Sequence, residues 1–294
     1  MPDSFVHSHA SHCESGVMSS LLRHHGLPMS EAMAFGLASA LSFAYLPFIR
    51  INGLPLVSYR MPPRAIIKGL ERSLGLGMRF ETFRSPPAGM ERLDALLDAG
   101  KLVGLQTSVF WLPYFPPDLR FHFNAHNLLV YGRELDDYLI SDPVAEAPVR
   151  CAREDLRRAR FAKGMLAPKG LLYFLTRPPA PPDWVRLGRR ALARTARIML
   201  APLPLVGVHG MRMLARQIER LPLADGGEGR ACTSATSFAC RRRSGPAAAV
   251  SGSSMRRSCR SWRPRPATRR STGSRRAWSR SATAGASSRS PRRA

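Results

Sequence analysis

The sequence predicts an α+β fold in which helices come first and an antiparallel sheet follows. In roughly the first hundred residues, several segments repeat apolar residues at three- and four-residue spacing, which is typical of helices that bury one face. Further along, short apolar runs bounded by turn residues are typical of strands. About 225 residues precede a sharp change in composition, which is enough for one large domain or one domain with a helical appendage.

Helices are expected where this spacing meets a start or stop signal. After Cys13 the stripe Val17, Met18, Leu21 and Leu22 ends at Gly26, and Ser30 is placed to cap the next helix. The predicted helices are 13–25, 30–41, 63–74, 89–99 and 152–162. The predicted strands are 54–60, 78–84, 102–109, 126–134, 138–141 and 170–176, and 147–150 is strand-like.

The chain is expected to divide into three parts. Residues 1–177 form the α+β domain, and 178–225 hold a stiff proline spacer followed by an incomplete helical region with helices at 184–199 and 205–220. The arginines of 184–199 leave three possibilities open: a solvated face, a contact with an acidic carrier protein, or a contact with anionic lipid. Residues 226–294 form a tail rich in arginine, serine and alanine.

The tail carries much of the formal charge of +25, and it has no acidic residue and no lysine after Glu228. One interpretation is a disordered polycation that binds nucleic acid through its phosphates. The absence of lysine, together with Trp262, Trp278 and three cysteines, favours instead a reading frame shifted near Asp225-Gly226-Gly227. Nucleic acid is therefore an expected partner only if the tail is genuine.

Three residues have local settings that suit nucleophilic catalysis. Cys13 lies in the first turn of a predicted helix, where free backbone N–H groups and the helix dipole favour a thiolate. His126 begins a strand, and a hairpin turn at Asp136-Asp137 returns the chain to Asp142 beside it. The sequence thus predicts a nucleophile, base and orienter in the order Cys13, His126, Asp142. The alternative for Cys13 is a small buried hydrophobe.

Other histidines offer weaker candidates. His122 is the nearest rival for the base, but its place in a loop favours a solvated or structural role. His7, His9, His12 and Cys13 could in principle bind zinc, although four ligands within seven residues would be cramped and no second Cys/His pair with suitable spacing occurs before the tail. We therefore expect no metal and no cofactor.

The sequence resembles the butirosin-biosynthesis-H family over roughly residues 6–222. The resemblance is carried by the blocks 11–15, 30–31, 35–37, 111–114, 126–132, 142–143 and 210–216. It implies a papain-like acyltransferase of secondary metabolism in which Cys13 accepts an acyl group from a carrier-protein thioester. His126 would then be the base and Asp142 its orienter, with a small-molecule amine as acceptor.

Two departures from the family and its fold bear on these roles. Relatives often carry an acidic residue in the strand before the histidine, whereas this chain has Gly-Leu-Gln-Thr-Ser over 104–108. If that carboxylate helps to bind an amine, acceptor binding is in doubt here. Papain-like enzymes use a glutamine upstream of the cysteine for the oxyanion, and none precedes Cys13; His7 could donate instead, beside the backbone N–H of Cys13. The alternatives are a cysteine peptidase or amidohydrolase with water as acceptor, and a non-enzymatic basic nucleic-acid-binding protein.

The expected cellular compartment is inferred from the membrane-spanning, signal and disulfide features that the sequence lacks. No apolar stretch reaches the ~20 residues needed to span a bilayer, and the N-terminus has no signal pattern. Before the tail the only cysteines are Cys13 and Cys151, which excludes a disulfide framework there. Cytoplasmic residence is expected.

Overall fold

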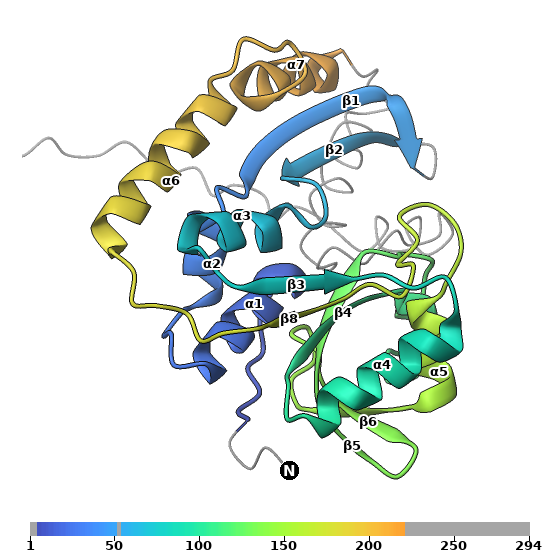
Figure 1. The fold of residues 1–294 in the computed structure, drawn as a ribbon. Coiled ribbons are helices and arrows are strands. Elements are labelled where there is room, and N and C mark those ends of the chain that lie inside the picture. Colours follow the sequence, from blue (N-terminus) through green and yellow to red (C-terminus); the bar gives the residue numbers. More distant parts are fainter. Residues whose placement is uncertain (1–4, 52–53, 221–294) are drawn as a thin grey trace, which may run out of the picture.

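The computed structural model describes residues 5–51 and 54–220 (Figure 1). They form a six-stranded antiparallel sheet with helices on both faces and a separate two-stranded sheet beside it. The α+β fold predicted from the sequence is confirmed. Residues 221–225 of the predicted helical region and the predicted tail, 226–294, lie outside the described residues.

The large sheet has the strand order β3-β8-β4-β5-β6-β7, so the central strands are β4 and β5. Each predicted strand is present. β3, β4 and β8 are each three residues shorter than expected, β6 begins one residue earlier, and β7 is shifted by two residues. The bounds are β3 (Met78–Glu81), β4 (Val103–Thr107), β5 (His126–Glu134), β6 (Asp137–Ser141), β7 (Val149–Ala152) and β8 (Leu172–Leu175).

The hairpin between β5 and β6 is confirmed, but its turn is one residue earlier than predicted. Glu134 pairs with Asp137, which leaves Leu135 and Asp136 as the turn. Leu135 takes a left-handed φ of 53° although its side chain is apolar and fully exposed. Aspartate is common in turns, so the pair Asp136-Asp137 predicts a turn at both positions, but Asp137 already belongs to β6.

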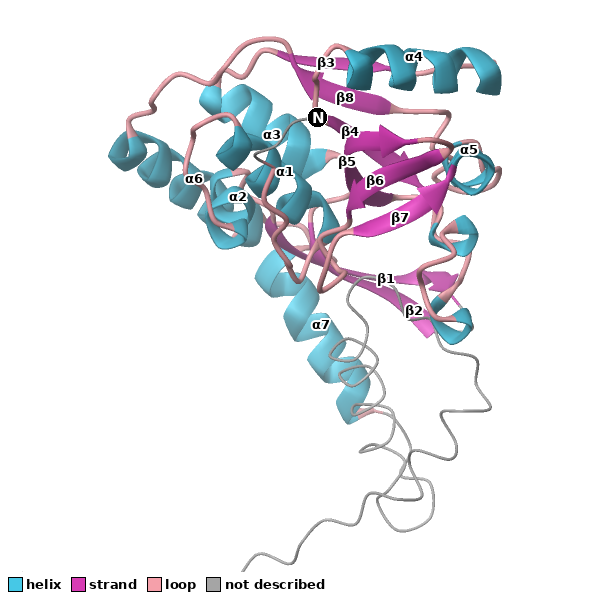
Figure 2. Cartoon of the chain, turned by 90° about the horizontal axis from the view of Figure 1, so that it is seen from below, coloured by secondary structure: helices cyan, strands magenta, loops and turns pink. Residues whose placement is uncertain are grey.

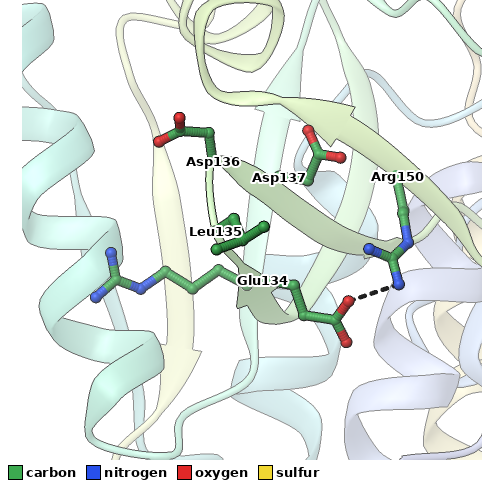
Figure 3. Close-up of a pocket in the computed structure, with 6 residues that line it drawn as sticks. Glu134, Leu135, Asp136, Asp137 and Arg150 are labelled. Carbon is green, nitrogen blue, oxygen red and sulfur yellow. Dashed lines mark ion pairs between the residues drawn. The ribbon is translucent and has the colours of Figure 1, made fainter.

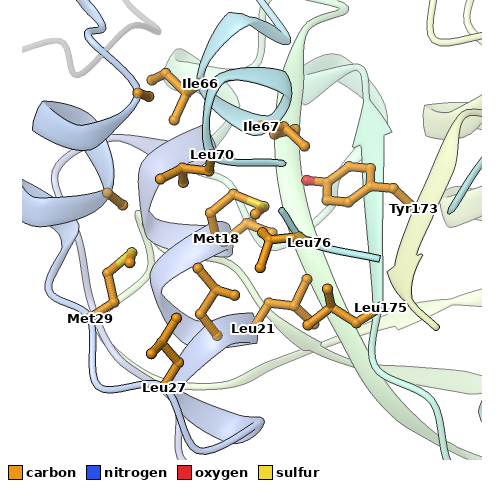
Figure 4. Close-up of a cluster of buried hydrophobic side chains, with 14 of the residues drawn as sticks. Met18, Leu21, Leu27, Met29, Ile66, Ile67, Leu70, Leu76, Tyr173 and Leu175 are labelled. Atoms are coloured by element: carbon orange, nitrogen blue, oxygen red, sulfur yellow. The ribbon is translucent and has the colours of Figure 1, made fainter. Parts of the chain in front are cut away.

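One face of the sheet is covered by α1 (Cys13–His24), α2 (Glu31–Leu37) and α3 (Ala65–Leu74). The predicted stripe of α1 is buried, and Met18 and Leu21 pack in one cluster with Leu70 of α3 and Tyr173 of β8 (Figure 4). This cluster fixes α1 on the sheet, and Cys13 is the first residue of that helix.

The other face is covered by α4 (Pro86–Asp98) and α5 (Arg153–Arg160). Alternate residues of β8 belong to the two hydrophobic cores on opposite faces of the sheet. Leu172 and Phe174 pack under α4 and α5. Tyr173 and Leu175 face α1 and α3. Strand β8 is therefore a continuous apolar run because both of its faces are buried.

The segment after α2 is the main error in the predicted elements. The helix expected over 30–41 ends at Leu37, and β1 (Leu41–Ile51) follows and pairs with β2 (Leu54–Arg60). Pro47 lies within β1, where the pairing is irregular between Leu46 and Arg50, which accommodates a residue without a backbone N–H. Ser30 caps α2 as predicted, accepting a hydrogen bond from the Met33 N–H at 3.1 Å.

The two-stranded sheet associates with α6 (Trp184–Met199) and α7 (Gly207–Glu219) (Figures 1 and 2). The Tyr45 N–H donates to the Leu205 carbonyl at 2.9 Å, and the Ser39 hydroxyl donates to the Ala191 carbonyl at 3.1 Å. Helix α7 begins two residues later than predicted, because Leu205 and Val206 are engaged with β1. Over the part of the chain with described structure, no helix is long and apolar enough to cross a membrane.

Candidate functional site

Cys13 is a free, fully buried cysteine at the first position of α1. At that position its backbone N–H has no acceptor within the helix. The free N–H groups and the positive end of the helix dipole favour negative charge on the thiol. The setting predicted from the sequence is thus the one observed.

Glu31, the first residue of α2, fixes the backbone that precedes Cys13. Its carboxylate accepts the backbone N–H groups of Ser11 at 3.0 Å and His12 at 2.6 Å. The two residues before Cys13 are therefore fixed by a helix that follows it in the sequence. The acid at the start of α2 was noted only as part of a family block, because nothing local shows which backbone it would reach.

Glu14, directly after Cys13, is a buried structural carboxylate. Its Oε1 accepts the backbone N–H groups of Ile66 at 3.0 Å and Ile67 at 3.2 Å. These bonds cap α3, whose own N-cap residue, Arg64, has a left-handed φ of 71° and no side-chain cap. Burial raises the pKa of Glu14, although these bonds and Arg60 oppose the shift.

His126 and Asp142 form the centre of the site. His126 Nε2 lies 2.6 Å from Asp142 Oδ2, and both side chains are buried. The Tyr114 hydroxyl donates to the same Oδ2 at 2.7 Å, and the Val144 N–H donates to Oδ1 at 3.1 Å. The ring of Phe115 meets the imidazole edge-on, with centroids 5.6 Å apart. These contacts fix the carboxylate and shield its bond to the imidazole from water.

The His126 imidazole is also hydrogen-bonded to the thiol of Cys13. Since Nε2 is taken by Asp142, Nδ1 is the ring nitrogen left for the sulfur. Burial alone would lower the pKa of His126, but the Asp142 carboxylate and the bonds to Asp142 and Cys13 outweigh it and raise the pKa well above its ordinary value. A raised pKa favours an imidazolium, which in turn favours a thiolate beside it.

Gly16 allows α1 to approach the loop that carries Asp142. A Cβ at this position would lie 2.5 Å from Pro143 Cβ and 2.8 Å from Ala10 Cβ. The Ala10 N–H also donates to the Pro143 carbonyl at 2.6 Å, so these segments are joined directly. The sequence gives no sign of this contact, because it depends on which loop lies opposite the helix.

We therefore expect Gly16→Ala to lower the free energy of unfolding by about 1–3 kcal/mol, as overpacking does. Alkylation of Cys13 by iodoacetamide should also slow, because α1 must move away from the loop that carries Asp142. Gly188→Ala in α6 is the matched control, since a Cβ there meets nothing within 4 Å. Equal stability and alkylation rates for the two variants in urea titrations and mass spectra would contradict this role.

Two histidines proposed from the sequence lie elsewhere. His122 is exposed and stacks on Phe110 with centroids 4.1 Å apart, so it does not compete with His126. The suggestion that His7 serves the oxyanion is wrong, because both of its ring nitrogens are used. Nδ1 is 2.7 Å from Ser141 Oγ, and Nε2 is 3.1 Å from the Ala145 carbonyl. Within the described ranges, no group of three or more His, Cys, Asp or Glu side chains could hold a metal ion.

Gln106, in the predicted strand segment 104–108 that lacks an acid, is buried and fully engaged. Its Nε2 donates to the carbonyls of Asn124 at 2.8 Å and Leu166 at 3.0 Å, and its Oε1 accepts from Arg64 Nε at 2.8 Å. The residue thus ties three loops to β4 and positions Arg64 at the start of α3.

Two surface hollows are remote from these groups. One lies at the tip of the β5–β6 hairpin, where Arg150 pairs with Glu134 at 2.6 Å (Figure 3). The other is lined by residues that include Phe83, Phe161 and Lys163. Neither contains Cys13, His126 or Asp142, and neither has convergent catalytic groups, so the site is assigned by its chemistry rather than by concavity.

Comparison with known families identifies two matches along the chain. Residues 12–143, which include all three site residues, match the family described as Butirosin biosynthesis protein H, N-terminal. Residues 154–239 match a domain of unknown function, DUF4872. The second match contains Asp225-Gly226-Gly227, where a frame change was predicted, and residues 240–294 lie outside both. That frame change stays a prediction.

Similar solved structures are distant in sequence. A protein described as a C39-like peptidase from Bacillus anthracis matches over 61% of this chain and 98% of its own, with 14% identity and a TM-score of 0.43. The peptidase domain of Streptococcus ComA, a bifunctional ABC transporter involved in quorum sensing, matches over 60% of this chain and 100% of its own, with 15% identity and a TM-score of 0.35. No curated protein matches the sequence.

Proposed function

We propose that the chain is a cysteine-dependent acyltransferase, since its residues 12–143 match the family described as Butirosin biosynthesis protein H, N-terminal. The family resemblance predicted from the sequence is confirmed, and family and site layout together support a papain-like cysteine enzyme. The observation that carries the proposal is the buried chain of thiol, imidazole and carboxylate in Cys13, His126 and Asp142.

Each of these residues has a defined role in the proposed reaction. The Cys13 thiolate attacks the carbonyl carbon of an acyl thioester, a new C–S bond forms, and the donor's C–S bond breaks. The departing thiolate takes the proton held by the His126 imidazolium. An amine then attacks the acyl-enzyme, His126 accepts the amine proton, and Cys13 is released as a thiolate. Asp142 holds the imidazole in orientation throughout.

Burial shields an acyl group at this site from bulk solvent, and it limits the access of water and of an amine alike. Cys13 and Asp142 are 0% exposed and His126 is 4% exposed, so water has little access to an acyl group held there. The same three residues could serve a cysteine peptidase or amidohydrolase, because triad geometry does not choose the acceptor. The nucleic-acid-binding alternative depends on the tail, which lies outside the described residues.

An acidic carrier protein is the donor that the surface charge supports. Arg186, Arg189, Arg190 and Arg197 are exposed along α6, and Ala191 is the one residue of this helix that is buried. A row of guanidinium groups of this kind attracts a partner of opposite charge and speeds its encounter. We therefore include a carrier-protein thioester as donor and a small-molecule amine as acceptor in the proposal.

Intact-protein mass spectrometry tests the proposal directly. The purified chain is mixed with a panel of acyl-loaded carrier proteins, and we expect a mass increase equal to one acyl group in the wild type. Cys13→Ala should show none. Cys151→Ala is the matched control, since Cys151 is also buried and free but lies on β7 and should leave the adduct intact.

The fate of the adduct then separates the alternatives. Discharge by added amines, with slow loss in buffer alone, supports a transferase. Rapid loss in buffer supports a hydrolase. Absence of any Cys13-dependent adduct from the folded chain across the whole panel would argue against the acyltransferase.

A further inference from the structure

His12 immediately precedes the proposed nucleophile and is only 8% exposed. It is the N-cap residue of α1, with an extended backbone at φ −134° and ψ 123°. Histidine is not among the favoured N-cap residues, which are serine, threonine, aspartate and asparagine. A histidine here therefore calls for an explanation beyond helix capping.

The hydrogen bonds of His12 define which ring nitrogen carries the proton. Nδ1 lies 3.0 Å from the Ser15 hydroxyl and accepts from the Ser15 backbone N–H at 3.3 Å. Because the backbone N–H can only donate, Nδ1 is an acceptor and is unprotonated. Burial, and then the charges of Arg60 and His126, lower the pKa of His12 to about 3. The ring is thus neutral at ordinary pH, and its single N–H is on Nε2.

That Nε2–H has no partner. Among the described side chains, His12 Nε2 is one of four buried nitrogen or oxygen atoms without a hydrogen bond. Leaving a buried donor unpaired costs about 1–3 kcal/mol, so such groups are uncommon and often have a functional reason. The Cys13 backbone N–H, the next donor along the chain, also has no acceptor within its helix.

We propose that the His12 Nε2–H and the Cys13 backbone N–H form the oxyanion hole of the site. His12 would then be a catalytic residue that replaces the glutamine missing before Cys13. The inference rests on the proposed acyl chemistry and goes beyond it by naming the donor. It also gives a partner to the one of these four unpaired atoms that belongs to the residue preceding the nucleophile.

The reaction gives both donors a partner. When the Cys13 sulfur bonds to the acyl carbon, the carbonyl π electrons move to the oxygen, which becomes an oxyanion. The two N–H groups donate to this oxygen without transferring a proton. When the leaving group departs with its bonding electrons, the carbonyl reforms and the donors are free again. Donors of this kind are fixed before the reaction, so they need no reorganisation.

Two reactions of the same thiol separate this role from a structural one. Acetylation of Cys13 by p-nitrophenyl acetate passes through an oxyanion, whereas alkylation by iodoacetamide is a displacement at carbon and does not. We expect His12→Asn and His12→Phe to slow acetylation by about 10²–10³-fold, the usual cost of losing one oxyanion donor. Alkylation should stay within about twofold of the wild type, because His12 is neutral.

The two variants have different structural defects. Asparagine retains an N-cap oxygen but loses the ring, whereas phenylalanine retains the ring volume but loses the cap. Both lack Nε2–H, so a shared loss of acetylation with unequal thermal stability points to the donor. His9→Asn, at an exposed position three residues earlier, is the control and should change neither rate.

Three results would overturn the inference. The first is a folded variant that is acetylated at the wild-type rate. The second is an equal fall in acetylation and alkylation, which would mean that His12 only positions Cys13. The third is a wild type that is alkylated but never acetylated, which would also remove the proposed function. Failure of the carrier-protein panel with retention of the His12 effect would instead leave the donor assignment intact.

Discussion

Asp142→Ala is expected to slow acylation of Cys13 by about 10⁴-fold, the scale seen when the orienting group of a triad is lost. It should also lower the free energy of unfolding by about 3–5 kcal/mol, as the loss of one partner of a buried ion pair does. Both effects come from one oxygen, because Asp142 Oδ2 accepts from His126 Nε2 at 2.6 Å and from the Tyr114 hydroxyl at 2.7 Å. Alanine would leave both donors buried without an acceptor.

Asp142→Asn is the matched variant that keeps an acceptor oxygen but removes the charge. Without the carboxylate, burial dominates and the pKa of His126 should fall below its wild-type value. In the wild type the raised pKa means that the imidazolium contributes its full stability below about pH 6.5. That contribution is lost as the pH rises through the raised pKa. The asparagine variant should lose most of this dependence on pH.

Proton NMR titration of His126 and urea unfolding at several pH values measure these effects. We expect the His126 imidazolium to persist above neutral pH in the wild type and to be absent at neutral pH in Asp142→Asn. Tyr114→Phe should have a smaller effect in the same direction, because one hydrogen bond to the carboxylate is lost but the charge remains. An unchanged His126 titration in Asp142→Asn would show that the carboxylate does not set its protonation.

The part of the site that could be predicted lies where chain order and local pattern agree. Strand β5 has the predicted bounds, and the hairpin brings His126 and Asp142 together even though its turn was misplaced by one residue. Helix α6 also has its predicted bounds, because Asp183 caps it and its apolar spacing is regular. Local signals of this kind need no knowledge of distant segments.

The parts that could not be predicted depend on contacts between distant segments. Glu31 accepts hydrogen bonds from the backbone just before Cys13, about 20 residues earlier in the sequence. Glu14 caps the start of α3, which lies more than 50 residues later. Tyr114 belongs to the family block 111–114, in which nothing local indicates that its hydroxyl reaches Asp142. The unpaired Nε2 of His12 is likewise visible only when every neighbour is in place. Such contacts follow from the packing of whole elements, so a local pattern contains no signal for them.

Gly104→Ala is expected to lower the free energy of unfolding by about 2–3 kcal/mol, near the upper end for overpacking. Gly104 is directly paired with Tyr173 between β4 and β8, and a Cβ on it would lie 2.1 Å from Tyr173 Cε2. The ring cannot swing away freely, because Tyr173 is fully buried and its hydroxyl donates to Asn127 Oδ1 at 3.1 Å. The backbone or the ring must therefore shift.

Gly132→Ala on β5 is the matched control. A Cβ there would meet only the flexible side chain of Leu139, with Cδ1 at 3.3 Å and Cγ at 4.0 Å. We expect a change of less than about 1 kcal/mol, with the entropy gained from replacing glycine offsetting any crowding. Urea unfolding of both variants measures the difference, and equal losses of stability would contradict the proposed clash.

A double-mutant cycle with Tyr173→Leu assigns the effect to the ring. If the clash is the cause, Gly104→Ala should destabilise the Tyr173→Leu background by much less, with a coupling of about 1–3 kcal/mol. The consequence extends to the site, since Asn127, which holds the Tyr173 hydroxyl, is the neighbour of His126 on β5. Gly104→Ala should therefore also slow the alkylation of Cys13, whereas Gly132→Ala should not. The sheet core beneath β4 would then be part of what holds the imidazole against the thiol.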